Sequence, residues 1–468
     1  MYALRMTARF TVLIVTMYLL SYSSNVSAQN EAVERVATLS HSGYVQGASW
    51  GEGNRSILTW GDQFANIWSI EGVLLLSLPH PDNVLEARWL EGNTRIFTWS
   101  YHGIHIFSVD GMLQVEISDE GNISGYVLNH DETRIITWSY DKAVKLWDTN
   151  GQLLYTIPHK ADTVQAYWNA DETLIVSWDE STTIYITNVN NGHTVEFSHE
   201  EWFEQPNAIY DYLVFPGDVI ISPDSQYILT ILGNKLHLWT VEGVHLDTFT
   251  HDDSVDEAVW SRDSRQFISW SFDNTARLWT IDGSVVAILH HNNSVGGAKW
   301  NNDESQILTW SYDSTARIWS NEGQLLVTLS HGNLDSEGQS IIVPEIPWTD
   351  NVDSAIWNAD QTRILTISSP FGYCPQECVY AAYLWNSDGE LIARMSHEST
   401  VFGVSWDPDE DFIVTWSADR TAKLWDEDGN LIATLSHNSR VISAVWSADG
   451  NSLITVSEDY IVSVWHVT

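Results

Sequence analysis

Histidine recurs along this chain at steps that are often 39 or 40 residues, each time between two short apolar runs. Histidine and carboxylate groups can bind metals or transfer protons. One histidine per repeat keeps the imidazoles apart, so we expect hydrogen bonding within each repeat, and neither a metal site nor a cofactor. The recurring positions are His41, His80, His159, His199, His251, His291, His331, His397 and His437, with aspartate recurring at Asp141, Asp273, Asp313, Asp419 and Asp459.

Other residues with chemical potential form weaker patterns. The sequence contains no G-x-S-x-G elbow, no G-x-x-x-x-G-K-[ST] phosphate loop and no H-E-x-x-H zinc motif. Asp256 and Glu257 are adjacent carboxylates that could bind a cation, although such pairs are common on solvated surfaces. The two cysteines, Cys374 and Cys378, are expected to form a local disulfide if the protein is exported.

Acidic residues dominate the charge of the chain. In 468 residues, 62 Asp and Glu oppose 21 Lys and Arg, which gives a formal net charge of −41. Such a field repels nucleic acids and anionic membranes and attracts basic partners, and it also promotes solubility. We therefore predict no nucleic-acid partner. A protein or a surface polymer is the expected partner, and the charge favours a basic one.

Residues 1–28 have the pattern of a secretory signal peptide. Arg5 and Arg9 precede an apolar run over 10–20, and the small residues Ser27 and Ala28 follow it. This run is too short to cross a bilayer comfortably. We expect cleavage and a mature domain over 29–468, without a membrane span, that is secreted, periplasmic or at the cell surface. A retained anchor is the alternative.

The chain is a series of ten repeats with tryptophan at fixed places. All but Trp202 and Trp348 of the 25 tryptophans fall at three positions of the repeat. Tryptophan buries a large apolar surface and keeps one donor, so we predict packing between repeats rather than an aromatic binding array. The repeats align at Trp68, Phe107, Trp147, Thr187, Trp239, Trp279, Trp319, Trp385, Trp425 and Trp465.

Each repeat contains four runs typical of short β-strands. In the seventh repeat they cover 294–300, 305–310, 315–319 and 324–331, and Asn, Asp, Ser and Gly separate them. No run is long enough, with a helical period, to predict a helix. Four strands repeated at a period near forty indicate a propeller or a solenoid.

These positions together resemble the WD-repeat family of β-propellers, in an exported, bacterial-type form, over almost all of the mature chain. The resemblance implies that each blade holds a buried tetrad of His, Ser or Thr, Asp and Trp. At the aligned third-strand position, the Trp-Asp pair itself survives only at Trp147–Asp148 and Trp425–Asp426. The complete tetrads are expected at His251, Ser271, Asp273 and Trp279, at His291, Ser311, Asp313 and Trp319, at His397, Ser417, Asp419 and Trp425, and at His437, Ser457, Asp459 and Trp465.

The two ends of the chain predict how the ring closes. Residues 36–41 form a fourth strand without its own unit, and 462–468 form a third strand without a fourth. Pairing them completes one blade and removes exposed sheet edges. We predict an all-β fold, a β-propeller of WD-repeat type with ten four-stranded blades in one ring. Two smaller rings are the alternative.

Three insertions interrupt the otherwise uniform turns, over about 200–217, 332–350 and 368–378. All three are expected on one face, because links from a fourth to a first strand and turns from a second to a third strand lie on the same side of a blade. Loops on a rigid scaffold commonly carry binding, and interfaces favour aromatic anchors. The candidate binding residues are Trp202, Phe203, Tyr210, Tyr212, Phe215, Trp348, Phe371 and Tyr373.

Two functions remain open from the sequence. The first is a secreted, non-enzymatic interaction scaffold that binds a protein or surface polymer through the insertion-bearing face. The second is an exported hydrolase or lyase with an acidic site at the channel mouth. Long loops that merely pack over the ring would favour neither function.

Overall fold

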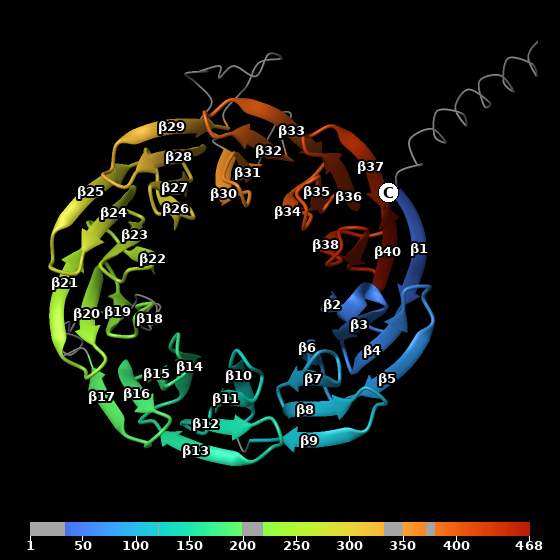
Figure 1. The fold of residues 1–468 in the computed structure, drawn as a ribbon, viewed down its shortest axis with the longest axis horizontal. Helices are drawn as coiled ribbons and strands as arrows, with labels where there is room; N and C mark the ends of the chain where they lie inside the picture. Colours follow the sequence, from blue (N-terminus) through green and yellow to red (C-terminus); the bar gives the residue numbers. More distant parts are fainter. Residues whose placement is uncertain (1–32, 120, 199–218, 332–349, 371–379) are drawn as a thin grey trace, which may run out of the picture.

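The computed structural model describes residues 33–119, 121–198, 219–331, 350–370 and 380–468. Its strands, β1 to β40, form ten antiparallel four-stranded sheets. These sheets are the blades of one ring around a central channel, with the first strand of each blade on the inside and the fourth at the perimeter (Figure 1). The prediction of ten blades in one ring is confirmed, and the alternative of two rings is wrong.

The blades are numbered here in chain order, and each is described from the channel outwards. Blades 1 to 5 are β2 (Gly47–Trp50), β3 (Ser56–Gly61), β4 (Phe64–Ser69), β5 (Leu74–Pro79); β6 (Val84–Leu90), β7 (Arg95–Ser100), β8 (Gly103–Ser108), β9 (Leu113–Ile117); β10 (Ile123–Leu128), β11 (Arg134–Ser139), β12 (Ala143–Asp148), β13 (Leu153–Pro158); β14 (Thr163–Trp168), β15 (Leu174–Asp179), β16 (Thr183–Asn188), β17 (Thr194–Ser198); and β18 (Val219–Ile221), β19 (Tyr227–Leu232), β20 (Lys235–Thr240), β21 (His245–Thr250).

Blades 6 to 10 repeat the same order. They are β22 (Val255–Trp260), β23 (Gln266–Ser271), β24 (Thr275–Thr280), β25 (Val285–His290); β26 (Val295–Trp300), β27 (Gln306–Ser311), β28 (Thr315–Ser320), β29 (Leu325–Ser330); β30 (Asp350–Trp357), β31 (Arg363–Pro370), β32 (Tyr380–Asn386), β33 (Leu391–His397); β34 (Val401–Trp406), β35 (Phe412–Ser417), β36 (Thr421–Asp426), β37 (Leu431–Ser436); and β38 (Val441–Trp446), β39 (Ser452–Ser457), β40 (Ile461–Val467), β1 (Val33–Ser40). A short 3-10 helix, η1 (Glu52–Asn54), lies in the first turn of blade 1.

The N-terminal strand closes the ring as predicted. Strand β1 pairs antiparallel with β40, from Val33 opposite Val467 to Ser40 opposite Ile461. Its residues Val33, Ala37 and Leu39 are buried, in two hydrophobic clusters on either side of blade 10. The last blade is therefore completed from both ends of the chain.

The hydrophobic core lies between neighbouring blades. One cluster, for example, joins Ile268 and Trp270 of blade 6 to Trp300 and Trp319 of blade 7. The second-strand tryptophans often lie over glycine: a Cβ on Gly297 would lie 2.0 Å from Cζ2 of Trp310. The same close approach occurs at Gly47, Gly125 and Gly403. Glycine on the first strand thus makes room for the indole beside it, which fits the packing role predicted for these tryptophans.

Candidate functional site

The repeated polar residues of blades 6, 7 and 9 form a relay of hydrogen bonds within each blade. In blade 7, the indole N–H of Trp319 donates to Oγ1 of Thr309 over 2.8 Å. The Thr309 hydroxyl lies 2.8 Å from Nε2 of His291, whose Nδ1 lies 3.1 Å from Oδ2 of Asp313. Each polar group satisfies the next, so the cluster can be buried at little cost. Blades 6 and 9 contain the same relay.

The hydroxyl of the tetrad lies two residues before the predicted one. Ser269, Thr309, Thr415 and Thr455 contact the histidine and tryptophan, whereas the prediction gave Ser271, Ser311, Ser417 and Ser457. The latter serines lie at the ends of the second strands. Ser311 donates instead to the carbonyl oxygens of Asn293 and Ser294. Residues two apart share one face of a strand. Only the register of strand pairing therefore decides which of the two hydroxyls contacts the histidine and the tryptophan.

The tetrad of blade 10 also differs from the prediction. His437 bonds through Nδ1 to the carbonyl of Leu435, at 2.9 Å, and not to Asp459. Asp459 accepts instead from the Ser457 hydroxyl. His437, Thr455 and Trp465 still form the other part of the relay.

The hydrogen bond between histidine and a second-strand hydroxyl occurs in more blades than the four with predicted tetrads. It also forms between His41 and Thr59, His80 and Thr98, His159 and Ser177, and His331 and Thr366. In blade 3, where Asp119 replaces the histidine, Lys145 takes a place between Asp119 at 2.5 Å and Asp141 at 2.6 Å. The degenerate blades thus keep a polar cluster with altered members.

The order of hydroxyl, imidazole and carboxylate is that of a catalytic triad, but the surroundings prevent catalysis here. Ser269 and Thr309 are 0% exposed, and their oxygens accept from indole N–H groups. Burial opposes ionisation of Asp273, yet hydrogen bonds from Thr275 and the Asp252 backbone hold its pKa at about 2. Burial lowers the pKa of His291 and so disfavours the charged imidazolium, although Asp313 partly opposes the shift. These clusters are structural.

Replacing Thr309 with Val should therefore destabilise the protein by about 1–3 kcal/mol, since the buried groups of His291 and Trp319 lose their partner. The free energy of unfolding in denaturant measures this loss. Thr328→Val, on the exposed side of β29, is the matched control and should change stability by less than about 0.5 kcal/mol. Equal losses in the two variants would contradict the structural tetrad.

The candidate binding residues lie outside the described residues. This is so for Trp202, Phe203, Tyr210, Tyr212, Phe215, Trp348, Phe371 and Tyr373, and also for Cys374 and Cys378. The structure does describe the residues that precede each insertion. Strand β17 precedes the first insertion, β29 and His331 precede the second, and β31 precedes the third. In blades 6, 7 and 9, the link that enters the first strand and the turn between the second and third strands lie side by side. The histidine of the link contacts the aspartate of the turn.

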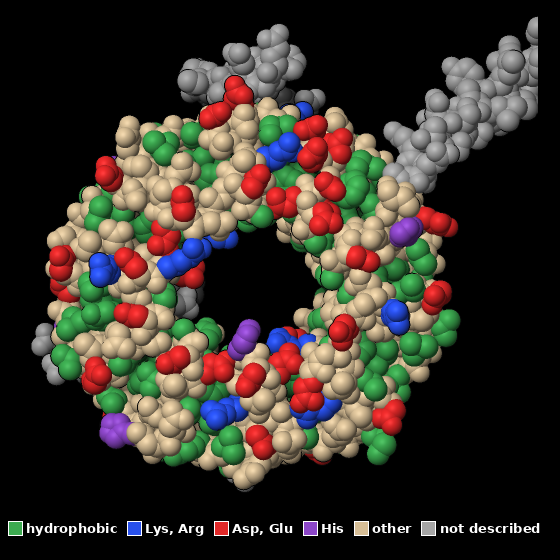
Figure 2. All heavy atoms as spheres, in the orientation of Figure 1, with side chains coloured by type: hydrophobic (Ala, Val, Ile, Leu, Met, Phe, Trp, Pro, Cys, Tyr) green, Lys and Arg blue, Asp and Glu red, His purple; other side chains and the backbone are tan. Residues whose placement is uncertain are grey.

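The channel wall of blades 4 to 7 contains a hollow of about 620 Å³. Trp168, Trp260, Trp270 and Trp310 line it, together with Glu257 and Lys299. Asp256 beside it is exposed and accepts from the indole N–H of Trp270 at 3.2 Å. Figure 2 shows the open channel and the acidic side chains spread around the ring. In the described ranges no group of three or more His, Cys, Asp or Glu is placed to hold a metal ion.

A second set of polar contacts was not predicted. In the turns between first and second strands, a side chain of one blade accepts a backbone N–H of the preceding blade. We call these contacts the inter-blade brackets. They join Glu132 to Glu91, Glu172 to His130, Ser264 to Asp224, Glu304 to Arg262, Glu410 to Ala359 and Asn54 to Ala448. The recurrence of Glu after the turn aspartate was the available signal in the sequence.

Within the described parts of the chain, no helix has the length and hydropathy for crossing a membrane.

Comparison with known proteins identifies the repeats. Residues 283–320, 389–426 and 429–466 match the family model of the WD domain, G-beta repeat. No curated protein matches the sequence significantly. Among solved structures, the chain is similar to the computationally designed Ika8 protein and to the C-terminal WD40 domain of Sif2, with TM-scores of 0.46 and 0.45. Both are 15% identical, over 93% of this chain and 100% and 99% of theirs. The chain is a ten-bladed β-propeller that carries WD40 repeats.

Proposed function

We propose that the protein is an exported, non-enzymatic scaffold that binds a protein or surface polymer through the face bearing its insertions. WD40 propellers typically serve as protein-interaction scaffolds. The observation that carries the proposal is that the recurring reactive groups of the blades are buried in hydrogen-bonded tetrads. The three insertions are then the longest departures from the uniform repeat, and all three replace links of the tetrad side.

Charge supports a basic rather than an acidic partner. The formal net charge of −41 favours encounter with positively charged surfaces and disfavours nucleic acids. Association steered by this field should slow as salt increases, because ions screen exposed charges. The export signal predicted from the sequence pattern of residues 1–28 favours an envelope or extracellular partner.

Changing Trp202 or Trp348 to Ala should weaken partner binding while leaving thermal stability nearly unchanged. Loss of an aromatic anchor costs about 2 kcal/mol or more, roughly thirtyfold in affinity. The partner is recovered by cross-linking to the full chain in the native extracellular fraction, and its affinity is then measured by calorimetry. Trp279→Ala is the matched comparison, because this tryptophan is 4% exposed and serves packing.

Two outcomes decide this prediction. Weaker binding with an unchanged melting temperature supports the insertion-bearing face. Normal affinity with a large fall in melting temperature would mean that the insertions are structural lids, and the proposed binding face would be wrong.

A further inference from the structure

The junction between blades 1 and 2 departs from the other junctions on the side opposite to the tetrads. Among the described residues, no inter-blade bracket joins its two turns. The bracket is also missing between blades 4 and 5, between blades 7 and 8 and between blades 9 and 10. The turns there keep Asn169, Asn301 and Asp407, whose side chains accept backbone N–H groups within the turn. Blades 1 and 2 have Gly51 and Leu90 at that position, so neither turn is filled in this way.

The two turns also have an unusual backbone. In most blades an aspartate closes the turn, as Asp131 does by accepting from the N–H and hydroxyl of Thr133. Blades 1 and 2 have Gly53 and Gly92 in its place, with φ of 67° and 60°. Glu91 beside Gly92 is left-handed as well, with φ of 51°, whereas the left-handed φ of 65° at Asn93 recurs at the equivalent residue of other blades, such as Glu132 and Glu172. Such conformations persist where the surroundings favour them, and they are frequent at functional sites.

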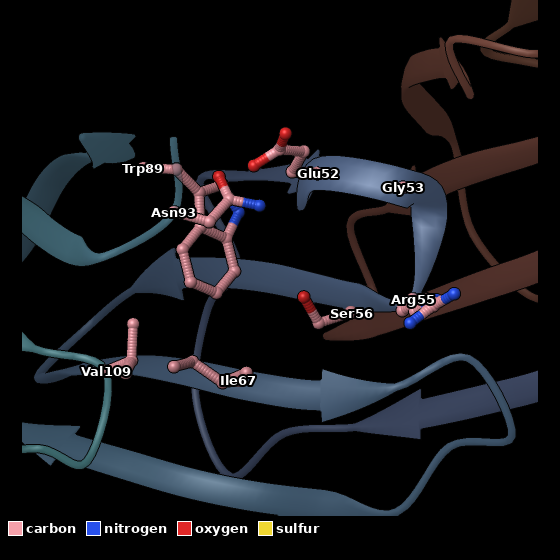
Figure 3. A pocket seen from close by; sticks show the side chains of 8 residues that line it. All are labelled: Glu52, Gly53, Arg55, Ser56, Ile67, Trp89, Asn93 and Val109. Carbon is pink, nitrogen blue, oxygen red and sulfur yellow. The ribbon is translucent and has the colours of Figure 1, made fainter. Parts of the chain in front are cut away.

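These changes leave a pocket of about 500 Å³ between the two blades (Figure 3). Trp89, Ile67 and Val109 supply apolar walls. Four polar side chains line the remainder and make no hydrogen bond or ion pair with any other described residue. They are Glu52, Arg55, Ser56 and Asn93.

The polar groups are close to the indole and to one another. A Cβ on Gly51 would lie 2.3 Å from Oγ of Ser56, 3.2 Å from Nδ2 of Asn93 and 3.3 Å from Cζ2 of Trp89. A Cβ on Gly92 would lie 3.5 Å from Oε2 of Glu52, so this carboxylate reaches across to blade 2. The absence of a side chain at Gly51 therefore keeps the pocket open.

From this arrangement we propose that the pocket binds one ring of a neutral sugar. A pyranose has hydroxyl groups around its rim, which donate and accept, and a face of C–H groups. Glu52 accepts, Arg55 donates, and Ser56 and Asn93 do both. The indole of Trp89 and the two aliphatic side chains provide the apolar contact that a sugar face requires.

Charged ligands fit the pocket less well. Glu52 and Arg55 leave no net charge in the lining, and the strongly acidic protein repels anions. An α-amino acid carries its ammonium and carboxylate on one carbon and needs opposite charges that converge. In Figure 3, Glu52 lies on the Asn93 side of the pocket and Arg55 on the other side. Polar groups dispersed in this way suit hydroxyls spread around a ring.

The test is ligand-observed NMR on the full mature chain. The probes are glucose, galactose, N-acetylglucosamine and their methyl glycosides, with glycine and glutamate as zwitterionic comparisons. Gly51→Asn restores the residue found in other blades and should fill the pocket. Asn93→Gly removes one polar partner without adding bulk, and glycine accepts the left-handed backbone at this position. Each variant should weaken sugar binding about tenfold or more, as expected for the loss of a partner to a hydroxyl.

Ser447→Asn is the matched control, because it makes the same kind of change at the equivalent turn of blade 10. Its affinity for the sugar should equal that of the unmodified chain. A neutral sugar that binds, and that is lost in both Gly51→Asn and Asn93→Gly with an unchanged melting temperature, supports the proposal. Absence of binding by every sugar, binding of the amino acids in their place, or sugar binding that persists in both variants would each overturn it. This outcome is independent of partner binding through the insertion-bearing face.

Discussion

Deletion of residues 29–41 should abolish the folded monomer. Strand β1 provides the outer strand of blade 10, and it pairs with β40 along nearly its whole length. Val33 and Leu39 alone bury side chains worth roughly 1.5–3 kcal/mol each. Arg35 adds a hydrogen bond to the carbonyl of Ser436 at 3.1 Å and lies over the ring of Trp465. Whole domains are stable by only about 5–15 kcal/mol, so this loss is a large part of the total.

The deletion also creates an exposed edge. Without β1, the backbone groups of β40 that face it are unpaired while the pairing with β39 remains, and an open strand edge promotes aggregation. Size-exclusion chromatography, thermal melting and limited proteolysis would report the change. The chain that begins at residue 29 is the control and should be monomeric and cooperative. A synthetic peptide of residues 29–41, added to the truncated chain, should restore part of the melting temperature because it replaces the missing strand.

A truncated chain with an unchanged melting temperature and a single monomeric peak would contradict the closure. Leu39→Asp gives a second measurement in the complete chain, since it places a charge at a site that is 0% exposed. It should destabilise the protein strongly, because a buried unpaired charge is costly.

Lowering the pH from 6.5 to 4 should destabilise the protein progressively. Burial lowers the pKa of four histidines from 6.5 to about 4, although carbonyl acceptors partly oppose the effect. In this interval the unfolded chain binds protons at these sites and the folded chain does not. The stability that neutral histidine provides is therefore complete above pH 6.5 and is lost as the pH falls towards 4. The histidines are His41, His80, His331 and His437.

The size of the effect follows from proton uptake on unfolding. Each proton taken up contributes a slope of about 1.4 kcal/mol per pH unit to the free energy of unfolding. His331 is the clearest contributor, since it is 2% exposed and bonds the Thr366 hydroxyl at 2.6 Å. Below pH 3.8 the carboxylates add to the loss, because hydrogen bonds outweigh burial and hold the pKa of Asp273 and Asp313 below the usual range.

His331→Gln separates the histidine contribution from the general charge of the protein. The variant should have a shallower dependence of stability on pH between 4 and 6.5, by about one proton. His193→Gln is the matched control, since His193 is exposed, and its slope should equal that of the parent. Denaturant unfolding at several pH values gives these slopes directly. Slopes that are the same for His331→Gln and the parent chain would contradict the assignment.

The sequence by itself determined the fold and its closure. A step of 39 or 40 residues repeated with four strand-like runs leaves a stacked or radial array of sheets as the solution. The unmatched runs at 36–41 and 462–468 complete one blade only if they pair, so the number of blades and the closing strand followed as well. Both inferences depend on periodicity and chain order, which are properties of the sequence.

The packing role of the tryptophans was also accessible. Their three fixed positions per repeat place them between blades, where bulky apolar side chains are needed. Trp279 and Trp319, at 4% and 5% exposed, have that position. The same periodicity predicted one hydrogen-bonded histidine per repeat, and histidine contacts a second-strand hydroxyl in blades such as 1, 2, 4 and 8.

The identity of the tetrad hydroxyl required the tertiary structure. Thr309 and Ser311 are both small hydroxyl residues on one face of β27, two positions apart. Pattern alone cannot separate them, because every second residue of a strand has the same orientation. The pairing of Thr309 with Arg317 in β28 places its oxygen below the indole of Trp319 and beside His291.

The pocket between blades 1 and 2 likewise depends on contacts across the junction. The sequence shows glycine at Gly51 and Gly92, but glycine in a turn ordinarily signals only backbone freedom. What matters is that Gly51 has Trp89 and Asn93 of the next blade as neighbours, so the missing side chain opens a space there. Residues in two separate turns meet only when the ring brings the blades together, and for this physical reason the sequence alone determined the ring but not this site.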